Sequence, residues 1–577
     1  MANTARHTRP ISTLRPDRHH TPTTPQMSHF DTPLLSRLEV TNAHETLLKL
    51  FSVHLRPRTA PGDVSMASDS FDPLLSRRQW LQGLAAVAAS AMFTGCGAAL
   101  YRVATPSTAS EPTPTQPALT PQPLPAGAIT AASLAISATA AGTLSPGFIG
   151  LAYEKQTLTT PLFTAASADL IGLFQRLGPS VLRLGGASVD RSVWTPNGNG
   201  QTPGEIAPPD VDALAAFLRA AGWTCIYAVN LGGSATGATT PALAAAEIAY
   251  AARQLGSALV GVEIGNECET YGSPGSFYPG NWSVEIFESL WKQFRAAIVA
   301  ATPSAPIVGP AAASDVATWT LPFGEYVTRS DIGLLTQHYH RGPAATATID
   351  DLLSPDTALA SELLLLKYGA QSIDVPFRID ACSAYDSGGA PGVSNTYASA
   401  LWAIDMIFQS ALGAASGLNF QSGGQQPCTP IADNAVTILG PQPLFYGLLL
   451  AAMAGTGTLL STDLSAASLN VTAYALQSAD QALSLVIVNK DATHNLDLDI
   501  MLPPGLSLSS ATLQTLTQLS TGATTPSLAA LSGVTLQDAT VAPDGAFQPA
   551  TPFALTLRGS QLTCYVPALS AVLISIT

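Results

Sequence analysis

A glutamate preceded by an asparagine ends one of the apolar segments of this chain, in the run Val262-Glu263-Ile264-Gly265-Asn266-Glu267. A carboxyl group at such a strand end can give a proton to the oxygen of a departing group. The amide of Asn266 beside it can bond a hydroxyl of the ligand. Glu263 stands earlier on the same strand face, and we expect it to brace the interior below the site.

Other short apolar segments also end in polar residues, in runs such as YE (153–154), RLGG (183–186) and QHYH (337–340). The candidates for ligand contact are therefore Glu154, Arg183, Asn266, His338, Tyr339 and Asp386. No acidic partner accompanies the histidines at the spacing of a metal site, so we expect them to line the ligand site. We expect neither a metal nor a cofactor.

The elements that must position these residues are eight short apolar segments that alternate with amphipathic ones. The segments span 148–153, 180–184, 225–230, 259–265, 306–309, 333–337, 376–380 and 417–420. Alternation of this kind predicts parallel βα units, and eight of them close a (β/α)8 barrel, the TIM barrel. Active sites of such barrels lie at the carboxyl ends of the strands, which is where the polar residues occur. We assign the barrel to residues 129–455.

The C-terminal stretch changes character, with alternating runs such as LNVTAYALQ and ALSLVIVNK separated by turn residues. This pattern predicts an antiparallel β-sandwich over residues 456–577. The run ITAASLAIS at 129–137 has the same character, and it can add a strand to that sandwich.

The first residues are not expected to belong to the fold. Residues 1–65 are rich in Arg, His, Thr and Pro without a sustained period, which indicates a disordered leader or a start placed too early. Residues 66–96 have the pattern of a twin-arginine signal peptide, and residues 97–128 form a Pro/Thr-rich linker.

The signal-like segment ends in Phe93-Thr94-Gly95-Cys96, which resembles a lipoprotein cleavage box. We therefore expect export and lipidation at Cys96, which would hold the protein at the cell envelope or periplasmic face through a lipid anchor only. An ordinary signal peptide with a chance cysteine is the alternative.

The composition and charge of the chain narrow the classes of partner that it can bind. Of the 577 residues, 46% are hydrophobic and 11% are charged, and the formal net charge is −14. A chain this acidic, without a basic cluster, is not expected to bind nucleic acid.

Cys268 and Cys382 flank candidate site positions. We expect them to be two small buried residues, with a disulfide at the cleft rim as the alternative.

Several motifs together resemble the β-glucuronidase/heparanase-type hydrolases of glycoside hydrolase family 79. They are FIGLAYE (148–154), SVLRLGG (180–186), EIGNE (263–267), GAPGVSNTYASALWAIDMIF (389–408) and PLFYGLLLAA (443–452). The resemblance runs from about residue 145 to the C-terminus. It implies a retaining mechanism on β-linked glucuronides, with Glu267 as acid/base and with Glu154 and Asn266 as sugar contacts.

The chain departs from this family where the nucleophile should stand. Counting back from Gly388, the position of the nucleophilic glutamate is occupied by Ala381. Strand alternation predicts that Asp380 points toward the helices, unless a bulge turns it inward. Asp386 replaces an aromatic residue thought to help hold the sugar carboxylate, and it would repel a uronic acid.

Two classes of function follow for a carbohydrate-binding cleft of this kind. In the first, the chain is a divergent exported glycoside hydrolase, with a changed substrate or with Asp386 as general base of an inverting reaction. In the second, it is a non-catalytic glycan-binding lipoprotein. The vacant position favours weak or absent hydrolysis. The sequence leaves the sugar, the linkage and the oligomeric state open.

Overall fold

The structure is a computed structural model that describes residues 119–577, apart from 314–315, 507 and 520–524. The predicted leader, the signal-like segment, Cys96 and most of the linker lie outside the described residues. In the part of the chain that is described, no helix is both long and apolar enough to cross a membrane.

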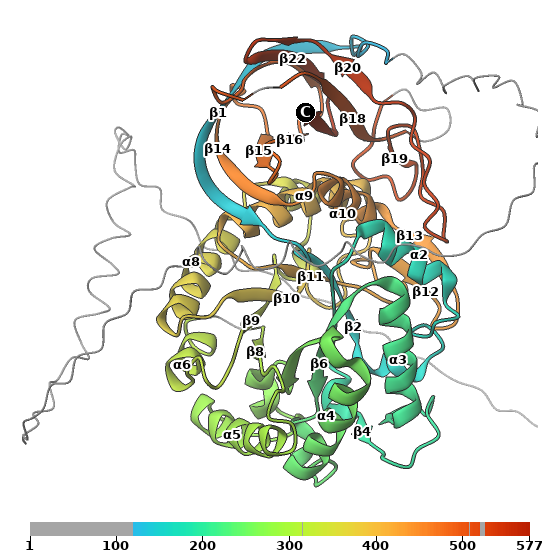
Figure 1. Cartoon of the computed structure of the whole chain (residues 1–577), viewed down its shortest axis with the longest axis vertical. Coiled ribbons are helices and arrows are strands. Elements are labelled where there is room, and N and C mark those ends of the chain that lie inside the picture. Colours follow the sequence, from blue (N-terminus) through green and yellow to red (C-terminus); the bar gives the residue numbers. More distant parts are fainter. Residues whose placement is uncertain (1–118, 314–315, 507, 520–524) are drawn as a thin grey trace, which may run out of the picture. The chain divides into compact units, whose positions relative to one another are not determined.

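A nearly closed barrel of eight parallel strands forms the first layer of the fold (Figure 1). Its strands are β2 (Ile149–Glu154), β3 (Val181–Gly185), β6 (Thr224–Val229), β7 (Leu259–Ile264), β8 (Gly309–Ala312), β9 (Leu335–His340), β10 (Phe377–Ser383) and β11 (Leu418–Gln421). The order around the barrel is β7-β6-β3-β2-β11-β10-β9-β8. Between β7 and β8 the ladder is short: the Val262 N–H donates to the Pro306 carbonyl at 2.8 Å, and the Val308 N–H donates to the Val262 carbonyl at 3.0 Å. The predicted barrel is confirmed, although its fifth strand lies later than the expected 306–309.

Helices surround the barrel and begin where the sequence supplies the usual start signals. They are α2 (Ala168–Leu177), α3 (Pro208–Ala221), α4 (Pro241–Leu255), α5 (Val284–Ala301), α6 (Thr320–Tyr326), α7 (Ile349–Leu353), α8 (Thr357–Ser372), α9 (Tyr397–Leu412) and α10 (Pro443–Met453). Pro241 opens α4 behind Thr240, whose hydroxyl accepts from the Leu243 N–H at 3.2 Å. Ser283 caps α5 in the same way.

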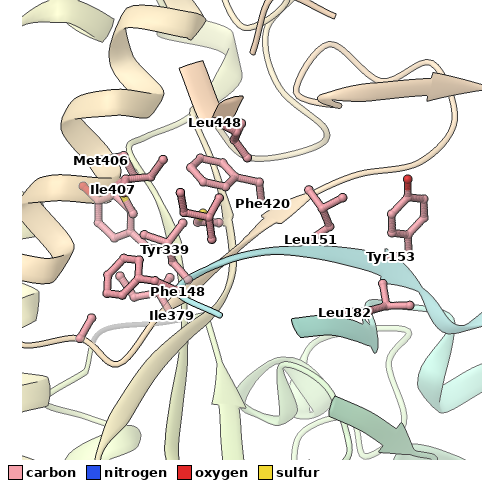
Figure 2. Close-up of a cluster of buried hydrophobic side chains, with 14 of the residues drawn as sticks. Phe148, Leu151, Tyr153, Leu182, Tyr339, Ile379, Met406, Ile407, Phe420 and Leu448 are labelled. Atoms are coloured by element: carbon pink, nitrogen blue, oxygen red, sulfur yellow. The ribbon is translucent and has the colours of Figure 1, made fainter. Parts of the chain in front are cut away.

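The outer face of the barrel strands packs against α9 and α10 through a layer of apolar side chains (Figure 2). Leu151, Ile379 and Phe420 reach this layer from three strands, and Met406 and Leu448 reach it from the two helices. The helices are buried on almost every side, because the second sheet covers the face that the barrel leaves free. This layer fixes which side of each strand is left to face the barrel interior.

The second layer is one large curled sheet. Its strands are β1 (Ala128–Leu144), β14 (Gly457–Ser465), β15 (Val471–Gln477), β16 (Leu483–Asn489), β17 (His494–Met501), β18 (Ala511–Gln518), β19 (Val534–Leu536), β20 (Phe553–Leu555), β21 (Leu557–Arg558), β22 (Gln561–Val566) and β23 (Ser570–Ile576). They follow the order β19-β18-β23-β16-β15-β14-β1-β17-β22-β21, and β20 pairs with β18. The sheet curls around its own apolar core, which includes Leu134, Leu485 and Ile574. The domain is sandwich-like, but it is made of one continuous sheet instead of two.

Strand β1 belongs to this sheet, since it pairs with β14 antiparallel and with β17 in parallel. The barrel therefore begins at β2 and not at residue 129. Two small ribbons complete the fold: β4 (Val193–Trp194) with β5 (Glu205–Ile206), and β12 (Ile431–Asp433) with β13 (Ile438–Pro441).

Candidate active site

A cleft of about 870 Å³ opens at the carboxyl ends of the barrel strands. Its lining includes Glu154 at the end of β2, Glu267 after β7, His338 and His340 on β9, and Ala381 on β10. Four strands and their following loops thus bring these side chains to one place, as the barrel geometry requires.

Glu267 stands in a turn whose backbone is firmly held. Its φ is +48°, a left-handed conformation that is uncommon for a residue other than glycine and that tends to occur at functional sites. The Glu267 N–H donates to the Ala311 carbonyl at 2.9 Å. The carboxylate of buried Asp190 accepts from the Leu231 N–H and the Asn266 N–H, at 2.8 and 3.2 Å. These bonds hold the turn so that the Glu267 side chain, 36% exposed, reaches the cleft.

The carboxylate of Glu267 is paired with a buried histidine. His338 Nδ1 lies 3.0 Å from Glu267 Oε1, and His338 Nε2 lies 3.6 Å from Asp380 Oδ2. Burial alone would lower the pKa of His338, but the charge of Asp380 and the hydrogen bond with Glu267 raise it to about 9. Burial alone would raise the pKa of Glu267, but the hydrogen bond and charge of His338 lower it to about 2. At neutral pH the two side chains are an imidazolium and a carboxylate.

Below the cleft, Arg183 is held by acidic partners. Its Nε lies 2.9 Å from Glu263 Oε2 and 3.1 Å from Asp380 Oδ2, and its Nη2 donates to Asn266 Oδ1 at 3.0 Å. Burial raises the pKa of Glu263 to about 8, against the opposing charge of Arg183. Burial would also raise the pKa of Asp380, but Arg183 and His338 hold it well below its usual range. Arg183 therefore stabilises the barrel interior, as does Glu263.

The expected orientation of Asp380 was wrong. On β9, Gln337 and His338 are consecutive, yet they pair with Ile379 and Ala381 of β10, so Asp380 is an extra residue in a β-bulge. The bulge turns both Asp380 and Ala381 inward, whereas Ile379 and Cys382 face the helices. Asp380 is fully buried among Arg183 and His338 and does not line the cleft.

Ala381 occupies the wall of the cleft beside His338, its partner in register on β9. The residue is 9% exposed. Ser383, two residues on, donates its hydroxyl to the Tyr385 carbonyl at 2.6 Å and lies 2.8 Å from His340 Nδ1. The side chains at these two positions carry no carboxylate.

Tyr339 was expected among the ligand contacts, and this was wrong. His338 and His340 face the cleft, so Tyr339 between them points to the outer side of β9. Its hydroxyl donates to Asp356 Oδ2 at 2.6 Å, at the start of α8. Its ring belongs to the apolar layer between strands and helices (Figure 2).

The remaining predicted residues divide between the cleft and its frame. Glu154 lines the cleft, and its carboxylate accepts from the Ala187 N–H, the Ser188 N–H and the Ser188 hydroxyl. Asp386 lines the rim, where its Oδ1 accepts from the Ala344 N–H at 2.9 Å. Asn266 is buried, and its Oδ1 accepts from Arg183 and the Gly186 N–H. It positions the turn before Glu267 and is absent from the cleft lining.

None of the individual ligand contacts expected from the sequence lies in the part of the cleft that follows β11. Gln421, Gln426, Asp433 and Asn434 line it from the loop and the small ribbon beyond. The polar run NFQSGG at the end of β11 was the available signal for this side of the cleft. The glutamine and asparagine amides can hydrogen-bond to hydroxyl groups of a ligand.

Cys268 and Cys382 are buried free thiols, so the disulfide at the cleft rim does not form. Across the described residues, no group of three or more His, Cys, Asp or Glu side chains has the arrangement of a metal site.

The chain matches no protein-family model and no curated protein sequence. Its fold is similar to that of a 4-O-α-L-rhamnosyl-β-D-glucuronidase from Fusarium oxysporum 12S, with a TM-score of 0.63, 17% identity, and coverage of 76% of this chain and all of the other. It is also similar to the family 51 arabinofuranosidase of Xanthomonas axonopodis pv. citri, with a TM-score of 0.56, 16% identity, and coverage of 78% and 100%. A family 44 xyloglucanase from Paenibacillus polymyxa matches with a TM-score of 0.53, 12% identity, and coverage of 78% and 100%. These neighbours are glycoside hydrolases by name, and at this identity they show a shared fold alone and do not single out family 79.

Proposed function

We propose that this chain is an exported glycoside hydrolase-like protein that binds β-linked glycosides in the cleft and hydrolyses them weakly or not at all. The observation that carries the proposal is the methyl group of Ala381 in the cleft wall beside the His338–Glu267 pair. A retaining glycosidase needs two carboxyl groups roughly 5–5.5 Å apart, one of them as nucleophile. An alanine at that position cannot form the covalent intermediate.

The neighbouring aspartate is a poor substitute for the nucleophile. Asp380 has no exposed surface, and it is paired with Arg183 at 3.1 Å and faces His338 at 3.6 Å. To attack a sugar, the Asp380 carboxylate would have to break its contacts with Arg183 and His338 and move from its buried position into the cleft. Removing one member of a buried ion pair costs roughly 3–5 kcal/mol, which opposes such a movement.

The charge state of Glu267 also argues against efficient catalysis. A general acid must hold a proton at the working pH, and enzymes raise the pKa of such carboxyls to about 6–7. Here His338 lowers the pKa of Glu267 to about 2, although burial alone would raise it. The side chain that should protonate the leaving oxygen is therefore ionised in the ligand-free protein. A carboxylate in this state is better suited to accept hydrogen bonds from sugar hydroxyls.

A divergent inverting hydrolase is the second candidate, because Asp386 lines the same cleft as Glu267. A carboxylate at the rim could activate water at the longer separation that inverting enzymes use, roughly 6.5–9.5 Å. Turnover of aryl β-glycosides, measured together with sugar binding by calorimetry, separates the two candidates. Binding without turnover supports the proposal, and rapid turnover with inversion at the anomeric carbon supports the second candidate. Absence of both binding and turnover would contradict both.

Export and anchoring form a separate part of the proposal and rest on the sequence alone. The twin arginines Arg77 and Arg78, the apolar stretch and Cys96 are the features that support them. Mass spectrometry of the exported protein should find a mature N-terminus at Cys96 that carries acyl chains. A mature form cut elsewhere and free of lipid would contradict anchoring and leave the cleft proposal untouched.

A further inference from the structure

The cationic side chains that line the cleft are already engaged with protein partners. Across the described residues, its basic lining consists of Arg183, His338 and His340. Arg183 is bound by Glu263 and Asp380, and His338 lies between Asp380 and Glu267. A sugar carboxylate entering this cleft would find no free guanidinium or ammonium group.

His340 does not supply a free positive charge in the cleft at neutral pH. Burial and the charge of His338 lower its pKa, against the opposing influence of Glu267 and Asp386. Its Nδ1 lies 2.8 Å from the hydroxyl of Ser383. A neutral imidazole can hydrogen-bond to a hydroxyl, but it does not neutralise the negative charge of a sugar carboxylate.

The acidic side chains of the cleft differ in the number of hydrogen bonds that they accept from the protein. Glu154 accepts three hydrogen bonds from Ala187 and Ser188, and both oxygens of Asp433 accept backbone N–H groups, from Gly424 and Ala435. Asp386 accepts one bond, to Oδ1 from the Ala344 N–H. Among the described residues, no lysine or arginine forms an ion pair with it. Asp386 is half-buried, so its charge is less screened than it would be at an open surface.

On the basis of the proposed function, we infer that the sugar preferred by this cleft is a cationic amino sugar, that Asp386 pairs with its ammonium group, and that uronic acids are disfavoured. The amides of Gln421, Gln426 and Asn434 complete the site, since they can bond the hydroxyls of a hexosamine. This specificity is the reverse of the one that the family resemblance implies. The reversal follows from an aspartate at the rim and from the absence of a free cation in the described lining.

The test uses three matched ligands, the β-1,4-linked tetramers of glucosamine, glucose and glucuronic acid. Calorimetry at a mildly acidic pH measures the binding of each tetramer. We expect the glucosamine tetramer to bind roughly tenfold more tightly than the glucose tetramer, and the glucuronic acid tetramer to bind most weakly. Added salt should narrow these differences.

The variant Asp386→Asn keeps an acceptor for the Ala344 N–H and removes the charge. It should lose about tenfold in affinity for the glucosamine tetramer and change little for the glucose tetramer. Glu325→Gln, an equal change of charge at an exposed position of α6 outside the cleft, should alter neither. Equal or tighter binding of the glucuronic acid tetramer overturns this inference and leaves the proposed function standing. An Asp386→Asn effect that is the same for all three tetramers also overturns it, whereas failure of all three to bind overturns both.

Discussion

His338 and Glu267 form an ion pair in which one partner is buried and the other reaches the ligand. The Nδ1–Oε1 distance is 3.0 Å, and the side chains are 2% and 36% exposed. Because the histidine is shielded from solvent, its charge acts on the carboxylate with little screening. The pair therefore determines whether the cleft presents a proton donor or a carboxylate.

Replacing His338 should change the protonation of Glu267. In His338→Asn the cation is lost while burial of Glu267 remains, so the pKa of Glu267 should rise from about 2 to above its usual value of 4.5. Carbon-13 NMR of the glutamate carboxyl groups, with Glu267→Gln to assign the signal, would measure this. A pKa that stays near 2 in the variant would mean that His338 does not control the charge of Glu267.

The buried charges below the cleft predict how stability depends on pH. Burial raises the pKa of Glu263 to about 8, and Asp380 together with Glu267 raises that of His338 to about 9 against the effect of burial. A group whose pKa is higher in the folded state than in the unfolded state stabilises the fold when the pH is below its unfolded pKa. This stabilisation is lost as the pH rises through the folded pKa. We therefore expect the melting temperature to fall between about pH 4.5 and 9, with Glu263 responsible for the lower part of this range and His338 for the upper part.

A matched variant isolates the part that Glu263 contributes. Glu263→Gln keeps a neutral side chain at every pH, so its contribution to the fall between about pH 4.5 and 8 should disappear, while the His338 part remains. Circular dichroism melts of both proteins across this range would compare them. Parallel curves for wild type and variant would show that Glu263 is ionised in the fold.

Arg183 should prove to be a structural residue. In Arg183→Met, Glu263 and Asp380 lose their buried partner, and the free energy of unfolding should fall by about 3–5 kcal/mol. The double variant Arg183→Met/Asp380→Asn should recover part of the loss, because it removes the uncompensated charge. Urea unfolding measures both. A loss below about 1 kcal/mol together with lost sugar affinity would instead make Arg183 a ligand contact.

Much of the barrel could be predicted from the sequence, because its strands are short apolar runs that end in polar residues. That rule also located Glu154, Glu267 and His338 in one cleft. Alternation, if applied to QHYH, would have placed Tyr339 outside as soon as His338 and His340 were placed inside. Tyr339 was assigned wrongly because neighbouring residues of this run were expected to line the site together.

Two features of the fold could be predicted only in part. The bulge at Asp380 is a local backbone event, and neither Asp380 nor Ala381 has a side chain that demands it. The place of β1 in the second sheet depends on pairing with β14 and β17, which lie more than 300 residues later. The alternating run at 129–137 predicted that this segment adds a strand to the C-terminal sheet, and this is confirmed. Its two partner strands could not be predicted, because contacts this distant leave no periodic signal in the segment itself.

If the methyl group of Ala381 stands where a retaining glycosidase needs its nucleophilic carboxylate, small anions should be able to act in place of that carboxylate. Turnover of an activated aryl β-glycoside by the wild-type protein should be very slow and should rise roughly tenfold or more with azide or formate. Ala381→Val, which fills the space beside Glu267, should abolish this rescue, and Ala381→Glu should raise turnover without added anion. Rapid turnover by the wild type without any anion, unchanged by azide or formate and not improved in Ala381→Glu, would contradict the account and would assign the reaction to another carboxylate.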